Sequence, residues 1–326
     1  MPKFRILIPN KMISKAVSYL KNYAIIDYYP IEQVMPEEEF IKKLSKVNGL
    51  IIPTQNKISK KVLKFAPHLK GVSNMAVGFD NLDLKALTEK KIMATNTPGV
   101  LTETVADLVF GLIISVARRI PEANQFVKQG KYHGWQPSLM LGTDVHHKRL
   151  GIIGYGRIGR AVAKRAKGFS MDVVYYNDIH RNIKDEKKIG ISFLSLKKLL
   201  KTCDFVLIQV PLTTKTKGMI SKEEFSLMKK QAILINAARG KVVDEESLIE
   251  ALKNHQISGA GLDVTAKDPI EKNNPLLKMK NVIITPHIGS ATIETRTKME
   301  MLAAKNMIEI IKGQKPKNLL NPKVFD

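Results

Sequence analysis

An arginine, an aspartate and a histidine each follow a short apolar segment in the second half of the sequence. Arg239 comes after AILINA, Asp268 follows GLDVTAK and precedes a proline, and His287 comes after NVIITP. Such segments are typical of buried parallel strands, and open α/β sheets bind ligands beyond the carboxyl ends of these strands. A guanidinium can clamp a carboxylate and polarise the adjacent carbonyl, and an imidazolium can donate a proton. These three residues are the candidate catalytic set.

A glycine-rich loop provides the second chemical signal. In LGIIGYGRIGRAVAKRA, an apolar strand leads into Gly154, Gly156 and Gly159, with Arg157 and Ile158 between them, and an alanine-rich helix follows. The first glycine permits a tight turn, the second lets the backbone approach a pyrophosphate, and the third lets helix and strand pack closely. The helix N-terminus then offers N–H groups to the phosphates. The pattern predicts dinucleotide binding; the alternative is a purely structural turn.

The next strand ends in VVYYNDIHR, where an acid would hold the ribose hydroxyls of the adenosine. The spacing places Asn177 at that position, with Asp178 one residue further. Asp178 would repel the 2′-phosphate of NADP, whereas Arg181 could attract it. The sequence therefore favours NAD over NADP without excluding NADP. The alternative is that these residues are polar loop residues with no role in cofactor binding.

Short β-branched segments alternate with helical ones almost throughout the 326 residues, which predicts two α/β domains with doubly wound parallel sheets. Helix starts are marked by Asp244 and by Ser221 with Glu224, a capping box. Two longer apolar-periodic helices, residues 102–119 and 293–313, are expected to connect the domains, with the second packing on the first domain. The predicted strands are residues 4–9, 49–54, 69–74, 91–96, 149–154, 172–177, 205–210, 232–237, 260–264 and 281–286.

Composition narrows the possible partners and compartments. The formal net charge is +23, but the lysines are spread along the chain rather than clustered, so a solvated basic surface is expected and no nucleic-acid partner. The single cysteine, Cys203, excludes an intramolecular disulfide and a cysteine metal cluster, which suits a reducing cytoplasm. No segment is apolar enough to predict a membrane span, and no metal site is expected.

Together, seven stretches resemble the D-isomer-specific 2-hydroxyacid dehydrogenases, and within them the glyoxylate/hydroxypyruvate reductases. The matching stretches are SNMAVGFDNLDL, TNTPGVLTETVADL, LGIIGYGRIGRAVAKRAKGF, QVPLTTKTKGMI, LMKKQAILINAARGKVVDEESLIEAL, GAGLDVT and NVIITPHIGSAT. The resemblance implies a discontinuous, flavodoxin-like substrate domain of residues 1–101 plus 288–326, and a Rossmann-like dinucleotide-binding domain of residues 102–287. It also implies an active site in the cleft between them and a homodimer.

The implied reaction is the reduction of a small 2-keto acid to a D-2-hydroxy acid, with hydride from nicotinamide and the proton from His287. In the family, a glutamate before a proline partners this histidine, and Asp268 is one methylene shorter. We expect Asp268 to pair with His287 through a shifted turn or one bridging water; the alternative is a turn acid without a partner. Asp263 is expected to be a cofactor-side or packing carboxylate.

The resemblance also assigns binding residues. The N–H groups of Ala76, Val77 and Gly78 are expected to hold the substrate carboxylate opposite Arg239, with Met75 either facing the pocket or packing in the core. The residues expected near the cofactor, besides the glycine loop, Asn177 and Asp178, are Thr104, Val210, Pro211, Thr216, Ala237, Ala238, Asp263, Gly289 and Ser290.

Several alternatives remain open at this stage. Trp135, in an aperiodic stretch, either contacts a second subunit or packs within its own chain. Relatives on the same scaffold act on phosphoglycerate, 2-ketogluconate or D-lactate. A non-catalytic nucleotide-sensing protein would keep the same three polar residues, so only turnover separates it from an enzyme.

Overall fold

The computed structural model describes residues 4–178 and 181–326, so Ile179 and His180, in the stretch after the predicted strand 172–177, lie outside the description. The chain divides into unit 1, Met1–Leu101 with Ser290–Asp326, and unit 2, Thr102–Gly289. The second boundary lies two residues beyond the expected 287/288. Ile288 and Gly289 stay with unit 2 because their N–H groups donate to the carboxylate of Asp263.

Unit 1 is built on a five-stranded sheet in the order β2-β1-β3-β4-β5, and all its strand pairs are parallel. This is the flavodoxin-like strand order, which confirms the predicted fold of the first domain. The strands are β1 (Arg5–Ile8), β2 (Ile25–Tyr28), β3 (Gly49–Ile52), β4 (Gly71–Asn74) and β5 (Met93–Thr95).

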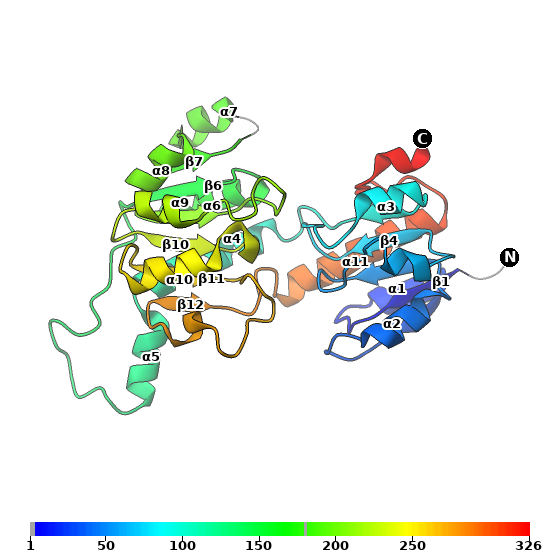
Figure 1. The fold of residues 1–326 in the computed structure, drawn as a ribbon, viewed down its shortest axis with the longest axis horizontal. Helices are drawn as coiled ribbons and strands as arrows, with labels where there is room; N and C mark the ends of the chain where they lie inside the picture. Colours follow the sequence, from blue (N-terminus) through cyan, green and yellow to red (C-terminus); the bar gives the residue numbers. More distant parts are fainter. Residues whose placement is uncertain (1–3, 179–180) are drawn as a thin grey trace. The chain divides into compact units, whose positions relative to one another are not determined.

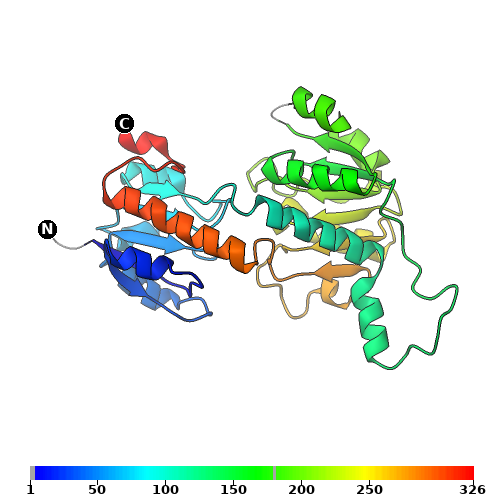
Figure 2. The ribbon, with the colours of Figure 1, turned by 180° about the vertical axis from the view of Figure 1, so that it is seen from behind.

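Helices cover both faces of this sheet and bury one hydrophobic cluster on each. The C-terminal helix α11 packs with α1 over β3 and β4, as the sequence predicted (Figure 2). The other face is covered by α2, α3 and a short 3-10 helix. The helical segments are α1 (Ala16–Lys21), α2 (Glu37–Leu44), η1 (Val62–Phe65), α3 (Leu84–Glu89), α11 (Ile293–Ile311) and η5 (Pro322–Phe325).

Unit 2 contains a seven-stranded parallel sheet in the order β12-β11-β10-β9-β6-β7-β8. The strand order reverses between β6 and β9, which is the switch point where dinucleotide-binding sheets hold their ligand. The doubly wound prediction is confirmed. The strands are β6 (Arg149–Ile153), β7 (Asp172–Tyr176), β8 (Ser192–Phe193), β9 (Phe205–Ile208), β10 (Ile233–Asn236), β11 (Gly259–Leu262) and β12 (Val282–Ile284).

The helices of unit 2 also lie on both faces of its sheet. One face carries α8, α9 and α10 (Figure 1), and the other carries α4 and α6 (Figure 2). The helical segments are α4 (Thr102–Ala117), α5 (Ile120–Lys128), α6 (Arg157–Gly168), α7 (Ile183–Asp185), η2 (Glu186–Gly190), α8 (Leu196–Thr202), α9 (Lys222–Leu227), η3 (Gly240–Val242), α10 (Glu245–Lys253) and η4 (Pro275–Lys278).

The predicted helix starts in unit 2 are present. The N–H of Ser221 donates to the carboxylate of Glu224 at 3.0 Å, which closes the capping box of α9. The side chain of Asp244 accepts from the N–H of Ser247 at 2.9 Å at the start of α10. Both caps satisfy N–H groups that the first helical turn cannot pair internally.

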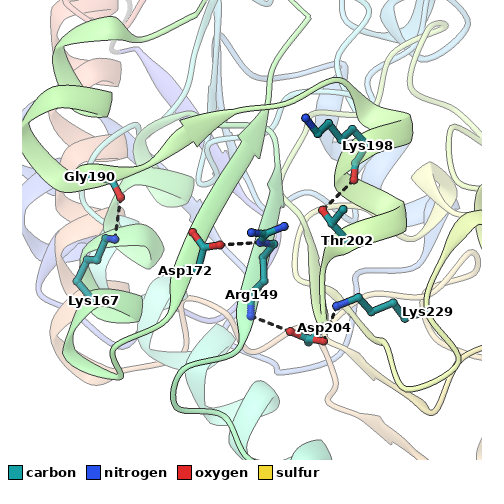
Figure 3. Close-up of polar contacts among 8 residues, drawn as sticks. All are labelled: Arg149, Lys167, Asp172, Gly190, Lys198, Thr202, Asp204 and Lys229. Atoms are coloured by element: carbon teal, nitrogen blue, oxygen red, sulfur yellow. Dashed lines mark hydrogen bonds and ion pairs between the residues drawn. The ribbon is translucent and has the colours of Figure 1, made fainter.

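A partly buried acid joins the amino ends of the two strands that flank the switch point. Asp204, just before β9, accepts from the N–H of Arg149 at 2.8 Å and from the ammonium of Lys229 at 2.9 Å (Figure 3). Burial by itself would raise the pKa of Asp204, but these two donors outweigh it and hold the pKa below its usual value. The pair of strands is therefore fixed at the end opposite the glycine loop.

Candidate active site

The three candidate catalytic residues come from three neighbouring strands of unit 2. Arg239 follows β10, Asp268 lies beyond β11, and His287 follows β12. These strands are adjacent and parallel, so their carboxyl ends share one edge of the sheet. The strand order thus brings together residues that are up to 48 positions apart in sequence.

His287 and Asp268 are in direct contact. Nδ1 of the imidazole lies 3.2 Å from Oδ2 of the carboxylate, and the side chains are 38% and 51% exposed, respectively. The shorter aspartate therefore reaches the histidine without an intervening molecule. Because the carboxylate takes Nδ1, the opposite ring nitrogen, Nε2, is left for a reacting group.

His287 is held in an unusual backbone conformation by a second acid. Its φ is 55°, in the left-handed region that a non-glycine residue adopts at a cost. Asp263, 1% exposed, accepts from Thr285 Oγ1 at 2.6 Å and from the N–H groups of Ile288 and Gly289, both at 2.8 Å. Both carboxylate oxygens of Asp263 are thus committed to the loop that carries the histidine, which supports the packing alternative of the sequence-based prediction.

The loop that carries Asp268 is anchored by a residue that the sequence did not reveal. Glu245, in the first turn of α10, accepts from the N–H of Ala266 at 2.9 Å and from the side-chain amide of Asn274 at 2.8 Å. An acid in the first turn of a helix normally indicates only a favourable interaction with the helix dipole. The sequence therefore gave no sign that Glu245 anchors the loop of Asp268.

The turn that carries Arg239 is organised by Asn236, which is 1% exposed. Its side chain accepts from the N–H of Ala238 at 3.1 Å and donates to the carbonyl of Arg239 at 3.0 Å. Gly240, which follows Arg239, must be glycine, since a Cβ there would overlap the carbonyl oxygen of Thr265. This close approach places the arginine turn directly beside the loop after β11.

The glycine loop fits a dinucleotide. Gly154 has a φ of +101°, and a Cβ there would lie 2.5 Å from the carbonyl oxygen of Gln209. A Cβ on Gly159 would lie 2.5 Å from the carbonyl oxygen of Gly154, whereas a Cβ on Gly156 would meet no atom within 4 Å. Gly156 is the N-cap residue before α6 and offers no side-chain cap, so the first-turn N–H groups remain for a phosphate. The open space at Gly156 is where the pyrophosphate of NAD(P) would approach.

Most of the other residues predicted to contact the cofactor lie beyond strand ends of the same sheet. Thr216 Oγ1 donates to the carbonyl of Pro211 at 2.6 Å and closes the turn after β9. Thr104 lies in the first turn of α4, and Ser290 is the first residue of the second segment of unit 1. The other predicted residues follow strand ends: Asn177 and Asp178 after β7, Val210 after β9, Ala237 and Ala238 after β10, and Gly289 after β12.

In unit 1, the loop after β4 has its carbonyl groups tied inward. The carbonyl groups of Ala76 and Val77 accept hydrogen bonds from Thr97 and Asn96. In a planar trans peptide, the N–H that follows a carbonyl points the opposite way, so the N–H groups of Val77 and Gly78 are directed away from these two donors. The N–H of Ala76 donates to the carbonyl of Asn74 at 2.9 Å, so it has an acceptor within its own loop, and its predicted role as a substrate donor stays a prediction. The anchors are the N–H of Thr97 to Ala76 at 2.9 Å, Asn96 Nδ2 to Val77 at 2.8 Å and Asn74 Nδ2 to Gly78 at 2.9 Å.

Met75 precedes this loop and is 9% exposed. It belongs to the hydrophobic cluster that also contains Met12, Ala303 and Met307. This environment matches the packing alternative rather than a pocket wall.

Within residues 4–178 and 181–326, no group of three His, Cys, Asp or Glu side chains could hold a metal ion. No described helix is long and apolar enough to cross a membrane.

Comparison with known proteins gives the family. Residues 110–289 match the family model described as D-isomer specific 2-hydroxyacid dehydrogenase, NAD binding domain. A glyoxylate reductase of Korarchaeum cryptofilum is 43% identical over 323 residues, covering 99% of this chain and 97% of the relative. The chain belongs to the D-isomer-specific 2-hydroxyacid dehydrogenase family. It is therefore an NAD(P)-dependent D-2-hydroxyacid dehydrogenase, as the resemblance implied.

Solved structures agree with this assignment. A crystal structure of a Thermus thermophilus protein is 39% identical, covers 97% of this dehydrogenase and 100% of that chain, and has a TM-score of 0.90. An NADPH-dependent glyoxylate/hydroxypyruvate reductase from Sinorhizobium meliloti, solved with NADP and malonate, is 28% identical, with a TM-score of 0.86 and coverage of 99% and 98%. The family and the use of NAD(P) are confirmed, while the preference for NAD stays a prediction.

Proposed function

We propose that this dehydrogenase reduces a small 2-keto acid of the glyoxylate or hydroxypyruvate type to the D-2-hydroxy acid. The observation that carries the proposal is the direct pair between His287 and Asp268, which lie beyond β12 and β11, the two strands that follow β10 and the turn of Arg239 in the sheet. Glyoxylate reductases among the relatives, at 43% identity over nearly the whole chain, support the substrate class.

The chemical roles follow from the donor groups. Reduced nicotinamide supplies a hydride to the carbonyl carbon when it is bound. His287, charged and held through Nδ1 by Asp268, donates the proton from Nε2 to the carbonyl oxygen. Arg239 polarises the carbonyl and neutralises the substrate carboxylate. The outward N–H groups of Val77 and Gly78 bind that carboxylate, since backbone N–H groups are good donors to anions.

Turnover tests the proposal. The purified enzyme is given glyoxylate, hydroxypyruvate, pyruvate and phosphohydroxypyruvate in turn, with NADH and NADPH side by side, and oxidation of the cofactor is followed by absorbance. We expect the highest kcat/KM with glyoxylate or hydroxypyruvate. The variant His287→Asn should lose about 10²–10⁴-fold in kcat while it still binds NADH, because only proton transfer is removed.

Two outcomes would contradict the proposed reaction, and a third would contradict the proposed substrate. Tight binding of NADH without turnover of any keto acid would support a nucleotide-sensing protein instead. Retention of most of the activity in His287→Asn would remove the histidine from the reaction. A preference for phosphohydroxypyruvate or pyruvate would keep the enzyme class and change the substrate.

We also propose that the enzyme is a cytoplasmic homodimer that uses the stretch after α5 as its contact surface. This stretch, residues 129–148, extends away from the sheet of unit 2 (Figure 2). It carries Trp135, 82% exposed, Tyr132, 50%, and Leu141, 67%, and Val127 at the end of α5 is 56% exposed. Exposed apolar residues gathered on one segment are typical of an interaction site.

The dimer proposal is tested by sedimentation. We expect the wild type to sediment as a dimer and Trp135→Ser/Leu141→Ser to sediment as a folded monomer. Ile293→Ser is a matched control, because Ile293 is 76% exposed but lies in unit 1. A monomeric wild type, or an unchanged dimer in the double variant, would contradict the assigned surface.

A further inference from the structure

A largely buried carboxylate beyond β7 holds the arginine that follows this strand. Glu186 accepts from Nε of Arg181 at 2.8 Å, from Nη2 of the same guanidinium at 2.6 Å, and from the hydroxyl of Tyr175 at 2.8 Å. The side chain of Glu186 is 11% exposed, against 59% for Arg181. One whole edge of the guanidinium is therefore committed to a carboxylate that is mostly out of water.

The segment around this pair is anchored to the sheet and to α6. The N–H of Asn182 donates to the hydroxyl of Tyr175 at 2.6 Å, and Tyr175 itself is fully buried in β7. At the other end of the segment, the ammonium of Lys167 donates to the carbonyl of Gly190 at 2.8 Å (Figure 3). Arg181 is thus held against the carboxyl end of β7 rather than carried on an unattached loop.

The neighbouring acid takes a second arginine. Asp185 pairs with Arg160 of α6 at 3.2 Å, and the guanidinium of Arg160 also lies over the ring of Tyr155 at 5.8 Å. Two consecutive acids, Asp185 and Glu186, therefore neutralise two arginines near the end of β7. In a sheet of this type, the adenosine ribose binds at that strand end, where a 2′-phosphate distinguishes NADP from NAD.

We propose that Glu186 sets the cofactor preference toward NAD by keeping Arg181 from binding a 2′-phosphate. The Nε/Nη2 edge of Arg181 is occupied by Glu186, so a 2′-phosphate would have to use the remaining Nη1 donors beside a carboxylate that already neutralises the charge. If Arg181 turned to a phosphate, Glu186 would keep a nearly buried charge with only the hydroxyl of Tyr175 as partner, which is costly. The exposed carboxylate of Asp178 adds repulsion at the same strand end.

The charge state of Glu186 supports this role. Hydrogen bonds from the Arg181 guanidinium, and the hydroxyl of Tyr175, outweigh burial and hold the pKa of Glu186 below its usual value. The carboxylate is therefore ionised at neutral pH, and the pair with Arg181 is present under working conditions.

The test measures binding of two small probes by calorimetry: 2′,5′-ADP, which carries the 2′-phosphate, and 5′-AMP, which lacks it. In Glu186→Gln, which keeps the shape and the Tyr175 contact, we expect affinity for 2′,5′-ADP to rise about tenfold, the scale of one charge-assisted hydrogen bond. Affinity for 5′-AMP should change by less than about twofold, and kcat/KM with NADPH should rise relative to that with NADH.

Two control variants separate the specific pair from charge alone. Asp185→Asn removes the same charge one residue away but releases Arg160, so it should change the affinity for 2′,5′-ADP by less than about threefold. Adding Arg181→Ala to Glu186→Gln should abolish the gain and return both affinities to the wild-type values.

Three results would overturn the proposal. These are no gain in Glu186→Gln, an equal gain in Asp185→Asn, or a gain that survives removal of Arg181. Should Glu186→Gln fail to fold, the affinities of the wild type for the two probes test the proposal. Binding of 2′,5′-ADP about tenfold tighter than 5′-AMP would mean that Glu186 does not keep Arg181 from the 2′-phosphate. The inference rests on the proposed function only for its kinetic readout. The probe affinities need no keto-acid turnover, so failure of one proposal is distinguishable from failure of the other.

Discussion

Replacing Asp263 by asparagine removes one hydrogen bond from the loop that holds His287, the proposed proton donor. The aspartate accepts from Thr285 and Ile288 through one oxygen and from Gly289 through the other. Asparagine can keep the first two contacts with its carbonyl oxygen. Its amide nitrogen would then face the N–H of Gly289, and two donors cannot pair.

The magnitude follows from this count. A hydrogen bond to a charged group contributes about 1.5–3 kcal/mol, and a buried N–H left without an acceptor costs about 1–3 kcal/mol. We expect Asp263→Asn to lower the free energy of unfolding of unit 2 by about 2–4 kcal/mol. His287, at a φ of 55°, relies on this loop, and a displacement of about 1 Å costs about 100-fold in rate.

Urea unfolding followed by circular dichroism measures the first effect, and kcat at saturating cofactor measures the second. Asp204→Asn is the matched control, because Asp204 is also a partly buried acid with two donors but lies at the amino end of the sheet. It should lower the stability of unit 2 by about 1–3 kcal/mol and leave kcat within about twofold.

The reasoning would be refuted if Asp263→Asn changed only the KM for the cofactor and left both kcat and the free energy of unfolding at wild-type values. Asp263 would then be a cofactor contact whose hydrogen bonds to the loop carry no weight. An equal loss of kcat in Asp204→Asn would show that the rate follows general stability rather than the position of His287.

Three further predictions concern the glycines and the partly buried Asp204. Gly156→Ala should change thermal stability by less than about 1 kcal/mol and raise the KM for the cofactor, whereas Gly154→Ala should lower stability by about 1–3 kcal/mol because of its φ of +101°. Gly240→Ala should prevent stable folding of unit 2 or abolish kcat, since its Cβ would overlap the carbonyl of Thr265. The depressed pKa of Asp204 contributes stability above the unfolded value of about 3.9, so the wild-type advantage over Asp204→Asn should disappear in acid unfolding curves as pH falls through the folded pKa.

The sequence predicted the elements whose signals are local. All ten proposed strands are present, because each carries a short run of strand-forming residues bounded by turn residues. The two strands that were missed, Ile25–Tyr28 and Ser192–Phe193, lie at sheet edges and are only partly buried. An edge strand needs less apolar surface, so its pattern resembles that of a loop.

The supports of the site were not predictable, because they depend on contacts between distant loops. Nothing in the sequence indicates that Glu245 binds the backbone of the Asp268 loop, or that Glu186 occupies Arg181. The sequence also did not show whether the side chain of Asp268 contacts His287 directly. Aspartate is one methylene shorter than glutamate, and only the position of the loop in the fold compensates for that difference. The hydrogen bond from the N–H of Ala76 to the carbonyl of Asn74 was not predictable for the same reason, since it forms only in the folded turn.

The kcat for keto-acid reduction in variants of Asp268, measured at one pH with saturating NADH, tests the proton donor most directly. The carboxylate of Asp268 holds Nδ1 of His287, which leaves Nε2 for the reacting carbonyl. Asp268→Asn should lower kcat by about tenfold or more, because the neutral amide no longer provides the charge-assisted hydrogen bond to the ring, while Asp268→Glu should retain most of the wild-type rate. Equal kcat values for the wild type and Asp268→Asn would show that the pair seen at 3.2 Å does not control proton donation.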